Sequence, residues 1–237
     1  DADADRIKEL GVDAKKVYVV GNMKFDDLPS QGVEELPKAL VSKSEMVLIA
    51  GSTHPGEEAI ILDIARAIGP QVPSLRLILA PRHPERAEEI MGLCEQKGFK
   101  AIKFSQLKEA LGEEVIVVDT IGHLRSLFRL GEIVFLGKSL TSKGGHNIIE
   151  PACYGKPIVV GPFMENFRDV TRIFLDNDAL IQVDDKDELQ AIIVELFDDK
   201  VLREKFGCNA QETVERHRGA TEKTLGIIAN FVKVETR

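Results

Sequence analysis

The chain has 237 residues, which is room for one or two domains, and 31 Lys and Arg against 39 Asp and Glu give a formal net charge of −8. Hydrophobic residues make up 43% of the chain and charged residues 30%, so wholesale disorder is excluded. The acidic balance argues against a nucleic-acid partner, which requires concentrated Lys and Arg. Three cysteines without C-x-x-C spacing favour a reducing compartment.

The amino-terminal segment predicts that the chain is part of something longer. Residues 1–11 (DADADRIKELG) have the pattern of the second half of an amphipathic helix that ends at Gly11, and the chain begins without Met. We expect residues 1–28 to be a connector from an amino-terminal domain that is missing here, and residues 29–237 to form one domain. No apolar run approaches the length of a membrane span and no signal peptide is visible, so we expect this fragment to be soluble.

Short apolar runs alternate with amphipathic segments along most of the chain. The runs are β-branched and four to six residues long, as expected for strands buried on both faces of a parallel sheet. These strand candidates are residues 17–20, 46–50, 75–80, 115–118, 133–136, 158–160 and 180–183. Helical patterns cover residues 57–68, 84–97, 147–154 and 167–177, and residues 187–232 are helical throughout, with breaks near 198–199 and 219. This alternation predicts an α/β fold, a Rossmann-like doubly wound parallel sheet with carboxyl-terminal helices.

Two turns contain His-Pro at the point where a predicted strand ends. Residues 51–58 (GSTHPGEE) follow one strand and residues 81–86 (PRHPER) follow another. Each segment is consistent with simple helix initiation, with Thr53 and His83 as caps. Because the carboxyl ends of parallel strands share one edge of the sheet, the pair of turns, with Arg82 and Arg86, also favours an anion site there.

The most informative segment is residues 137–151 (GKSLTSKGGHNIIEP), after the strand at 133–136. Gly144 and Gly145 permit close approach of backbone amides to a ligand, and a helix start near Asn147 adds N–H groups, so the segment is a candidate phosphate cradle. Glu150 has two interpretations. It lies three residues after Asn147, as in a capping box, and it is also a carboxylate that can accept hydrogen bonds from ribose hydroxyls.

Two further turns offer weaker signals, and several common motifs are missing. Gly122 brings backbone close to the same sheet edge, and Phe163 and Phe167 either line a ligand or belong to the core. There is no G-x-G-x-x-G for a dinucleotide and no G-x-S-x-G for a hydrolase. No clustered Cys and His suggest a metal site, so we expect neither metal nor cofactor.

Taken in order, five motifs resemble the 3-deoxy-D-manno-octulosonic acid (Kdo) transferases of lipopolysaccharide synthesis. They are residues 21–26 (GNMKFD), 51–57 (GSTHPGE), 80–86 (APRHPER), 119–122 (DTIG) and 144–152 (GGHNIIEPA), and the resemblance covers only the carboxyl-terminal half of that family. It implies the donor-binding half of a two-domain GT-B enzyme, an inverting glycosyltransferase that moves Kdo from CMP-Kdo to lipid A precursor.

The resemblance also implies a set of site residues. The predicted contacts with CMP or CMP-Kdo are Ser52, Pro81, Arg82, Ile121, Gly122, His123, Gly144, Gly145, Asn147, Ile148, Ile149 and Glu150. No catalytic residue is expected in this chain, because the family's general base, acceptor surface and membrane contact belong to its amino-terminal domain. The full-length protein is therefore expected at the cytoplasmic face of the inner membrane, and this fragment alone is expected to be inactive.

Two positions depart from the family pattern, and two other functions remain open. The family usually has Glu at the position of His123 and Gly at that of Lys138, so both contacts are in question. The alternatives are another GT-B nucleotide-sugar enzyme, such as a UDP-sugar transferase or an epimerase, and a non-catalytic binding module whose loops are only helix starts.

Overall fold

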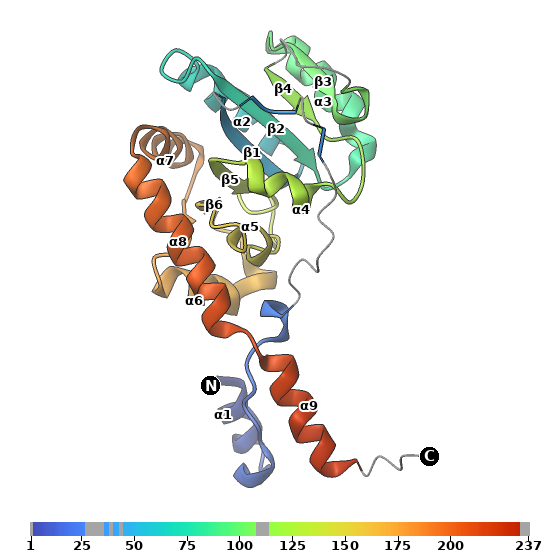
Figure 1. Cartoon of the computed structure of the whole chain (residues 1–237), viewed down its shortest axis with the longest axis vertical. Coiled ribbons are helices and arrows are strands. Elements are labelled where there is room, and N and C mark those ends of the chain that lie inside the picture. Colours follow the sequence, from blue (N-terminus) through green and yellow to red (C-terminus); the bar gives the residue numbers. More distant parts are fainter. Residues whose placement is uncertain (1, 27–35, 38–39, 43–44, 108–113, 233–237) are drawn as a thin grey trace. The chain divides into compact units, whose positions relative to one another are not determined.

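The structure, a computed structural model, describes residues 2–26, 36–37, 40–42, 45–107 and 114–232 (Figure 1). Its centre is a seven-stranded sheet in the order β3-β4-β2-β1-β5-β6-β7, in which every neighbouring pair is parallel. The strands are β1 (Met46–Thr53), β2 (Leu75–Pro81), β3 (Ala101–Lys103), β4 (Val115–Val117), β5 (Ile133–Leu136), β6 (Ile158–Val160) and β7 (Ile181–Gln182).

Helices connect most of the strands and form the carboxyl-terminal part of the chain. Their bounds are α1 (Ala2–Glu9), α2 (Glu57–Ile68), α3 (Ala87–Gln96), α4 (Leu124–Leu127), α5 (Ile149–Ala152), α6 (Arg168–Asp176), α7 (Lys186–Asp198), α8 (Lys200–His217) and α9 (Ala220–Phe231). The predicted breaks in the last segment are confirmed, because α7 ends at Asp198 and α9 begins after Gly219, which has a φ of 94°.

Both faces of the sheet are covered. Alternate strand residues such as Leu48, Leu77 and Phe135 join α2, α3 and α7 in one apolar core. Their neighbours Ile49 and Ile78 point to the opposite face and are also fully buried. The continuous apolar runs therefore reflect a sheet that is enclosed on both sides, as the sequence predicts.

The structure corrects the sequence prediction at two strands. Residues 17–20 are not a strand, because Tyr18 and Val19 are more than half exposed and the segment has no partner strand among the described residues. The strand Ala101–Lys103 has no counterpart in the prediction, because it is a three-residue, half-buried edge strand. The helix expected at 147–154 is shorter, spanning Ile149–Ala152.

The chain divides into two compact units. One comprises Asp1–Leu28 with Val214–Arg237, and the other comprises Pro29–Thr213, which holds the sheet. The predicted boundary between residues 28 and 29 lies outside the described residues. In the first unit, the carboxylate of Asp26 accepts hydrogen bonds from the backbone N–H groups of Gly219 and Thr221 at 2.6 Å each, at the start of α9. Within the described ranges, no helix is both long and apolar enough to cross a membrane.

Candidate nucleotide site

The strand order reverses between β1 and β5. The chain continues from β1 to β2 on one side, and β5 returns to the other side of β1. In open α/β sheets, ligands bind beyond the carboxyl ends of the strands at such a reversal. The turns that carry the predicted motifs, after β1, β2, β4 and β5, all lie at this edge of the sheet.

Two adjoining cavities open at this edge, of about 290 Å³ and about 350 Å³. Ser52, Arg82, Gly122 and Leu124 line both cavities. The structure therefore brings together seven of the predicted site residues in the walls of the two cavities: Ser52, Pro81, Arg82, Ile121, Gly122, Asn147 and Glu150. The larger cavity also contains Phe167, so one of the two aromatics faces this space.

The remaining predicted residues lie outside the cavity walls. The ring of His123 packs on Phe104, with ring centroids 4.9 Å apart. Ile148 and Ile149 are fully buried. Their side chains therefore belong to the buried interior beneath the loop after β5 and do not face the cavities.

The glycine pair does not present free amides in this structure. The N–H of Gly144 donates to the carboxylate of Glu165 at 2.9 Å, and the N–H of Gly145 donates to the carbonyl of Lys138 at 2.7 Å. A Cβ at Gly145 would collide with the thioether of Met164, and its φ is 70°. Close packing and backbone conformation thus explain why both residues are glycine. The two N–H groups were expected to face a ligand, but in this structure they are bonded within the protein.

Asn147 shapes the start of α5 without a capping box. Its Oδ1 accepts a hydrogen bond from the N–H of Ile149 at 3.1 Å, and its Nδ2 lies 3.5 Å from Oε1 of Glu150. In a capping box, Asn147 would instead accept from the N–H of Glu150. Glu150 lines the larger cavity, which is where the second interpretation requires its carboxylate to lie.

A buried carboxylate holds the turn after β5. Oε2 of Glu57 accepts from the N–H groups of His54 at 2.9 Å and Lys138 at 2.8 Å, and Oε1 accepts from those of Ser139 and Leu140, each at 3.1 Å. Glu57 is fully buried. The first turn of the candidate phosphate cradle therefore wraps a carboxylate of the protein itself. The sequence pattern indicates only a helix start at Glu57 and contains nothing that points to this role.

Two residues at this edge adopt a backbone conformation that non-glycine residues rarely use. Ser52 has a φ of 54° and Lys138 a φ of 55°. Such strain costs of the order of 1 kcal/mol and is concentrated at functional sites. The conformation of Lys138 is one that favours glycine, the residue expected at this position from the resemblance.

The two arginines after β2 differ in their partners. Arg86 makes an ion pair with the buried Glu58 at 2.7 Å and another with Glu89 at 2.8 Å, so it is committed to the fold. The guanidinium of Arg82 has no hydrogen bond or ion pair within the part of the chain that the structure describes, and it lines both cavities. The sequence suggested both for an anion site, and the geometry selects Arg82.

Three histidines, His54, His83 and His146, gather beside Arg82, and none of them is among the predicted site residues. Nε2 of His54 lies 3.3 Å from Nε2 of His146, which lines the larger cavity, and the ring of His83 meets His54 edge-on with centroids 6.0 Å apart. Burial is the main cause that lowers the pKa of His146 to about 4 and also lowers that of His54. Among the described residues, no group of three His, Cys, Asp or Glu side chains is placed to hold a metal ion.

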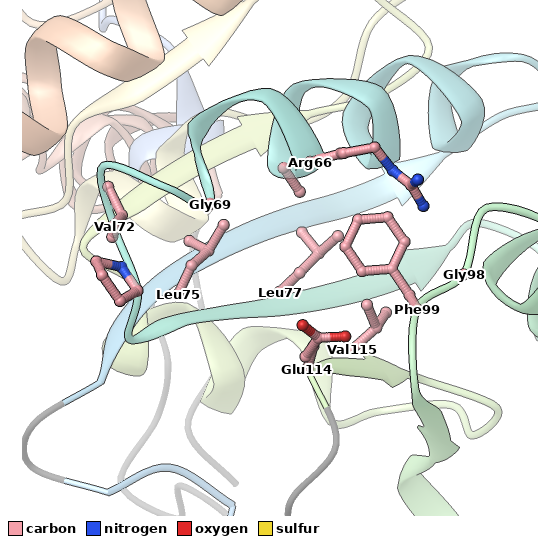
Figure 2. Close-up of a pocket in the computed structure, with 11 residues that line it drawn as sticks. Arg66, Gly69, Val72, Leu75, Leu77, Gly98, Phe99, Glu114 and Val115 are labelled. Carbon is pink, nitrogen blue, oxygen red and sulfur yellow. The ribbon is translucent and has the colours of Figure 1, made fainter.

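A separate cavity of about 320 Å³ lies at the opposite edge of the sheet. Figure 2 shows its lining, gathered between the end of α2 and the starts of β2 and β4. The guanidinium of Arg66 lies 5.2 Å from the ring centroid of Phe99, and Leu75 and Leu77 supply an apolar wall. This cavity lies at the amino ends of the strands, whereas ligands of such sheets bind beyond the carboxyl ends. The fold therefore does not favour it as the nucleotide site.

Comparisons with known proteins assign the family. Residues 49–213 match the glycosyl transferases group 1, and the chain belongs to this family. It is 31% identical over 235 residues to the 3-deoxy-D-manno-octulosonic acid transferase of Haemophilus influenzae, covering 96% of this chain and 55% of that protein. The corresponding transferase of Aquifex aeolicus is 33% identical over 224 residues, covering 92% and 60%. The chain thus spans about half the length of the curated relatives it matches.

Solved structures agree with the fold. The C-terminal CMP-Kdo binding domain of WaaA from Acinetobacter baumannii is 29% identical with a TM-score of 0.68, covering 73% of this chain and 90% of that one. A putative UDP-N-acetylglucosamine 2-epimerase from Listeria monocytogenes, 16% identical with a TM-score of 0.64, shares the fold alone. The predicted resemblance to Kdo transferases and the predicted GT-B half are confirmed.

Proposed function

We propose that this chain is the donor-binding half of an inverting glycosyltransferase that transfers Kdo from CMP-Kdo to lipid A precursor. The observation that supports it most strongly is the pair of cavities at the β1/β5 reversal. Arg82, whose guanidinium has no partner among the described residues, and the acidic Glu150 line the same cavity there. A cation for a phosphate and a carboxylate for ribose hydroxyls are the groups that a nucleotide donor requires. The similarity to the CMP-Kdo binding domain of WaaA supports the choice of donor.

The proposal divides the donor among the two cavities. Arg82, at the junction, neutralises the phosphate and stabilises the charge on CMP as it departs, which lowers the barrier to transfer. Glu150 accepts from the ribose, and the turn with Ile121 and Gly122 lies against the cytosine. The proposal gives three other tasks to a part of the protein outside these 237 residues. They are acceptor binding, the general base and contact with the cytoplasmic face of the inner membrane.

Calorimetric titration with CMP, UMP and AMP tests the nucleotide. CMP should bind most tightly, and Glu150→Ala should weaken it about 10-fold or more, because hydrogen bonds to a charged group contribute about 1.5–3 kcal/mol. Glu95→Ala, at an exposed position on α3, is the matched control and should leave affinity unchanged. Equal affinity for the three nucleotides would remove the CMP assignment, and tighter binding of UMP would favour a UDP-sugar enzyme.

A further inference from the structure

His54 and His146 form a pair across the strand reversal. His54 follows β1 and His146 lies in the loop after β5, so the two neighbouring strands at the switch point each contribute one ring. The Nε2 atoms are 3.3 Å apart, and the ring planes are inclined by 28° with centroids 5.5 Å apart. For a hydrogen bond at this contact, one nitrogen donates and the other accepts, so the pair holds one proton between its facing atoms.

The surroundings hold this pair uncharged when the site is empty. Burial, the neighbouring histidine and the cations Arg82 and Lys138 together lower the pKa of His146, and burial lowers the pKa of His54. Both imidazoles are therefore neutral at pH 7. The pair, of which His146 lines the larger cavity, is thus kept in the neutral form, which can gain a proton once a negative charge arrives.

The charges that face the pair favour an anion over a cation. From α2, Glu57 and Glu58 act on His54, but Glu57 is engaged by four backbone N–H groups and Glu58 by Arg86. From the turns after β2 and β5, the facing groups are the cations Arg82 and Lys138 together with His83, whose Nδ1 lies 3.4 Å from Glu85. Neither cation has a hydrogen bond or ion pair from its side chain within the described ranges. A metal ion would be repelled by both.

We propose that His54 and His146, together with Arg82 and Lys138, form a proton-linked subsite for the phosphodiester of the nucleotide donor, which takes up one proton as the ligand binds. The inference rests on the proposed function for the identity of the ligand. An imidazolium produced in this way donates to a phosphate oxygen, and the charge gained in the complex offsets the negative charge that grows on departing CMP.

The probe is the methyl ester of CMP, with the methyl ester of UMP and sulfate as comparisons. Between pH 8 and pH 6 the phosphodiester keeps one negative charge and the base stays uncharged, so any pH dependence in that range belongs to the protein. Titrations at pH 7 in buffers of different ionisation enthalpy count the protons taken up. Because the empty pair is neutral and the occupied pair is charged, affinity rises as pH falls from 8 toward 6, by about tenfold per pH unit at most.

Double replacement of His54 and His146 by Gln should abolish the proton uptake and flatten the pH dependence. His217→Gln, whose ring stacks on Phe25 in the other unit, should leave both unchanged. Melting temperatures report whether each variant is folded. Binding of either ester without proton uptake, or uptake that persists in the double variant, would overturn the inference. Uptake with the UMP ester but no preference for the CMP ester would overturn only the proposed donor, and failure of both esters and sulfate to bind would contradict both.

Discussion

Replacing Glu57 should destabilise the sheet unit more than replacing any exposed carboxylate in its turns. Glu57→Ala leaves four backbone N–H groups, those of His54, Lys138, Ser139 and Leu140, without their acceptor in a fully buried place. At about 1 kcal/mol for each donor, the low end for a buried group left unsatisfied, the loss is about 4 kcal/mol. For a unit of this size, that corresponds to a fall in melting temperature of about 8–16 °C.

The isosteric variant refines the prediction. Glu57→Gln keeps one oxygen, which can still accept two of the four hydrogen bonds, but its NH₂ group faces the other two donors. The loss should then be about half as large, about 2 kcal/mol. Urea unfolding followed by circular dichroism gives the free energy of unfolding for both variants.

Glu85→Ala is the matched control. Glu85 lies in the other His-Pro turn, but its side chain is 74% exposed, so its replacement should change stability by less than about 0.5 kcal/mol. The reasoning is refuted if Glu57→Ala and Glu85→Ala unfold at the same urea concentration, or if Glu57→Gln is more destabilised than Glu57→Ala.

Two other variants test local features. Lys138→Gly should raise the free energy of unfolding by about 0.5 kcal/mol, because glycine adopts a φ of 55° without strain. It should also weaken the binding of phosphate esters several-fold, because a cation is removed. A fall in the free energy of unfolding of more than about 1 kcal/mol, measured in urea, would contradict this. Asp26→Asn should reduce the helicity of α9 at pH 6 but not at pH 2. The backbone N–H groups of Thr221 and Gly219 lower the pKa of Asp26 below 3.8, so its stabilising effect is present above about pH 4 and lost as pH falls through the folded-state pKa. An acid titration followed by circular dichroism that shows equal helicity at pH 6 would argue against this cap.

The sequence predicted those parts of the fold that depend on burial alone. Runs such as residues 133–136 are apolar because both faces of the sheet are covered, and that requirement is visible in the composition of each run. Residues 17–20 have the same composition, but a strand also needs a neighbour to pair with, which a local pattern does not contain. The edge strand Ala101–Lys103 is the opposite case: the sequence pattern misses it, because pairing with β4 makes it a strand and its own apolarity does not.

The site was predictable as a set of turns but not as a set of contacts. Parallel topology alone places the turns with Ser52, Arg82, Gly122 and Glu150 at one sheet edge. Which arginine is committed to an ion pair depends on α2, which brings Glu58 to Arg86 across 28 positions. The pairing of His54 with His146 across 92 positions is likewise a tertiary feature.

A crystal structure of the chain with CMP tests the central claim most directly. We predict that the phosphate lies within hydrogen-bond distance of Arg82 and His146, that the ribose hydroxyls face Glu150, and that the base lies against Gly122. CMP bound in the cavity beside Arg66 and Phe99 at the opposite edge of the sheet, with the β1/β5 edge empty, would contradict the account.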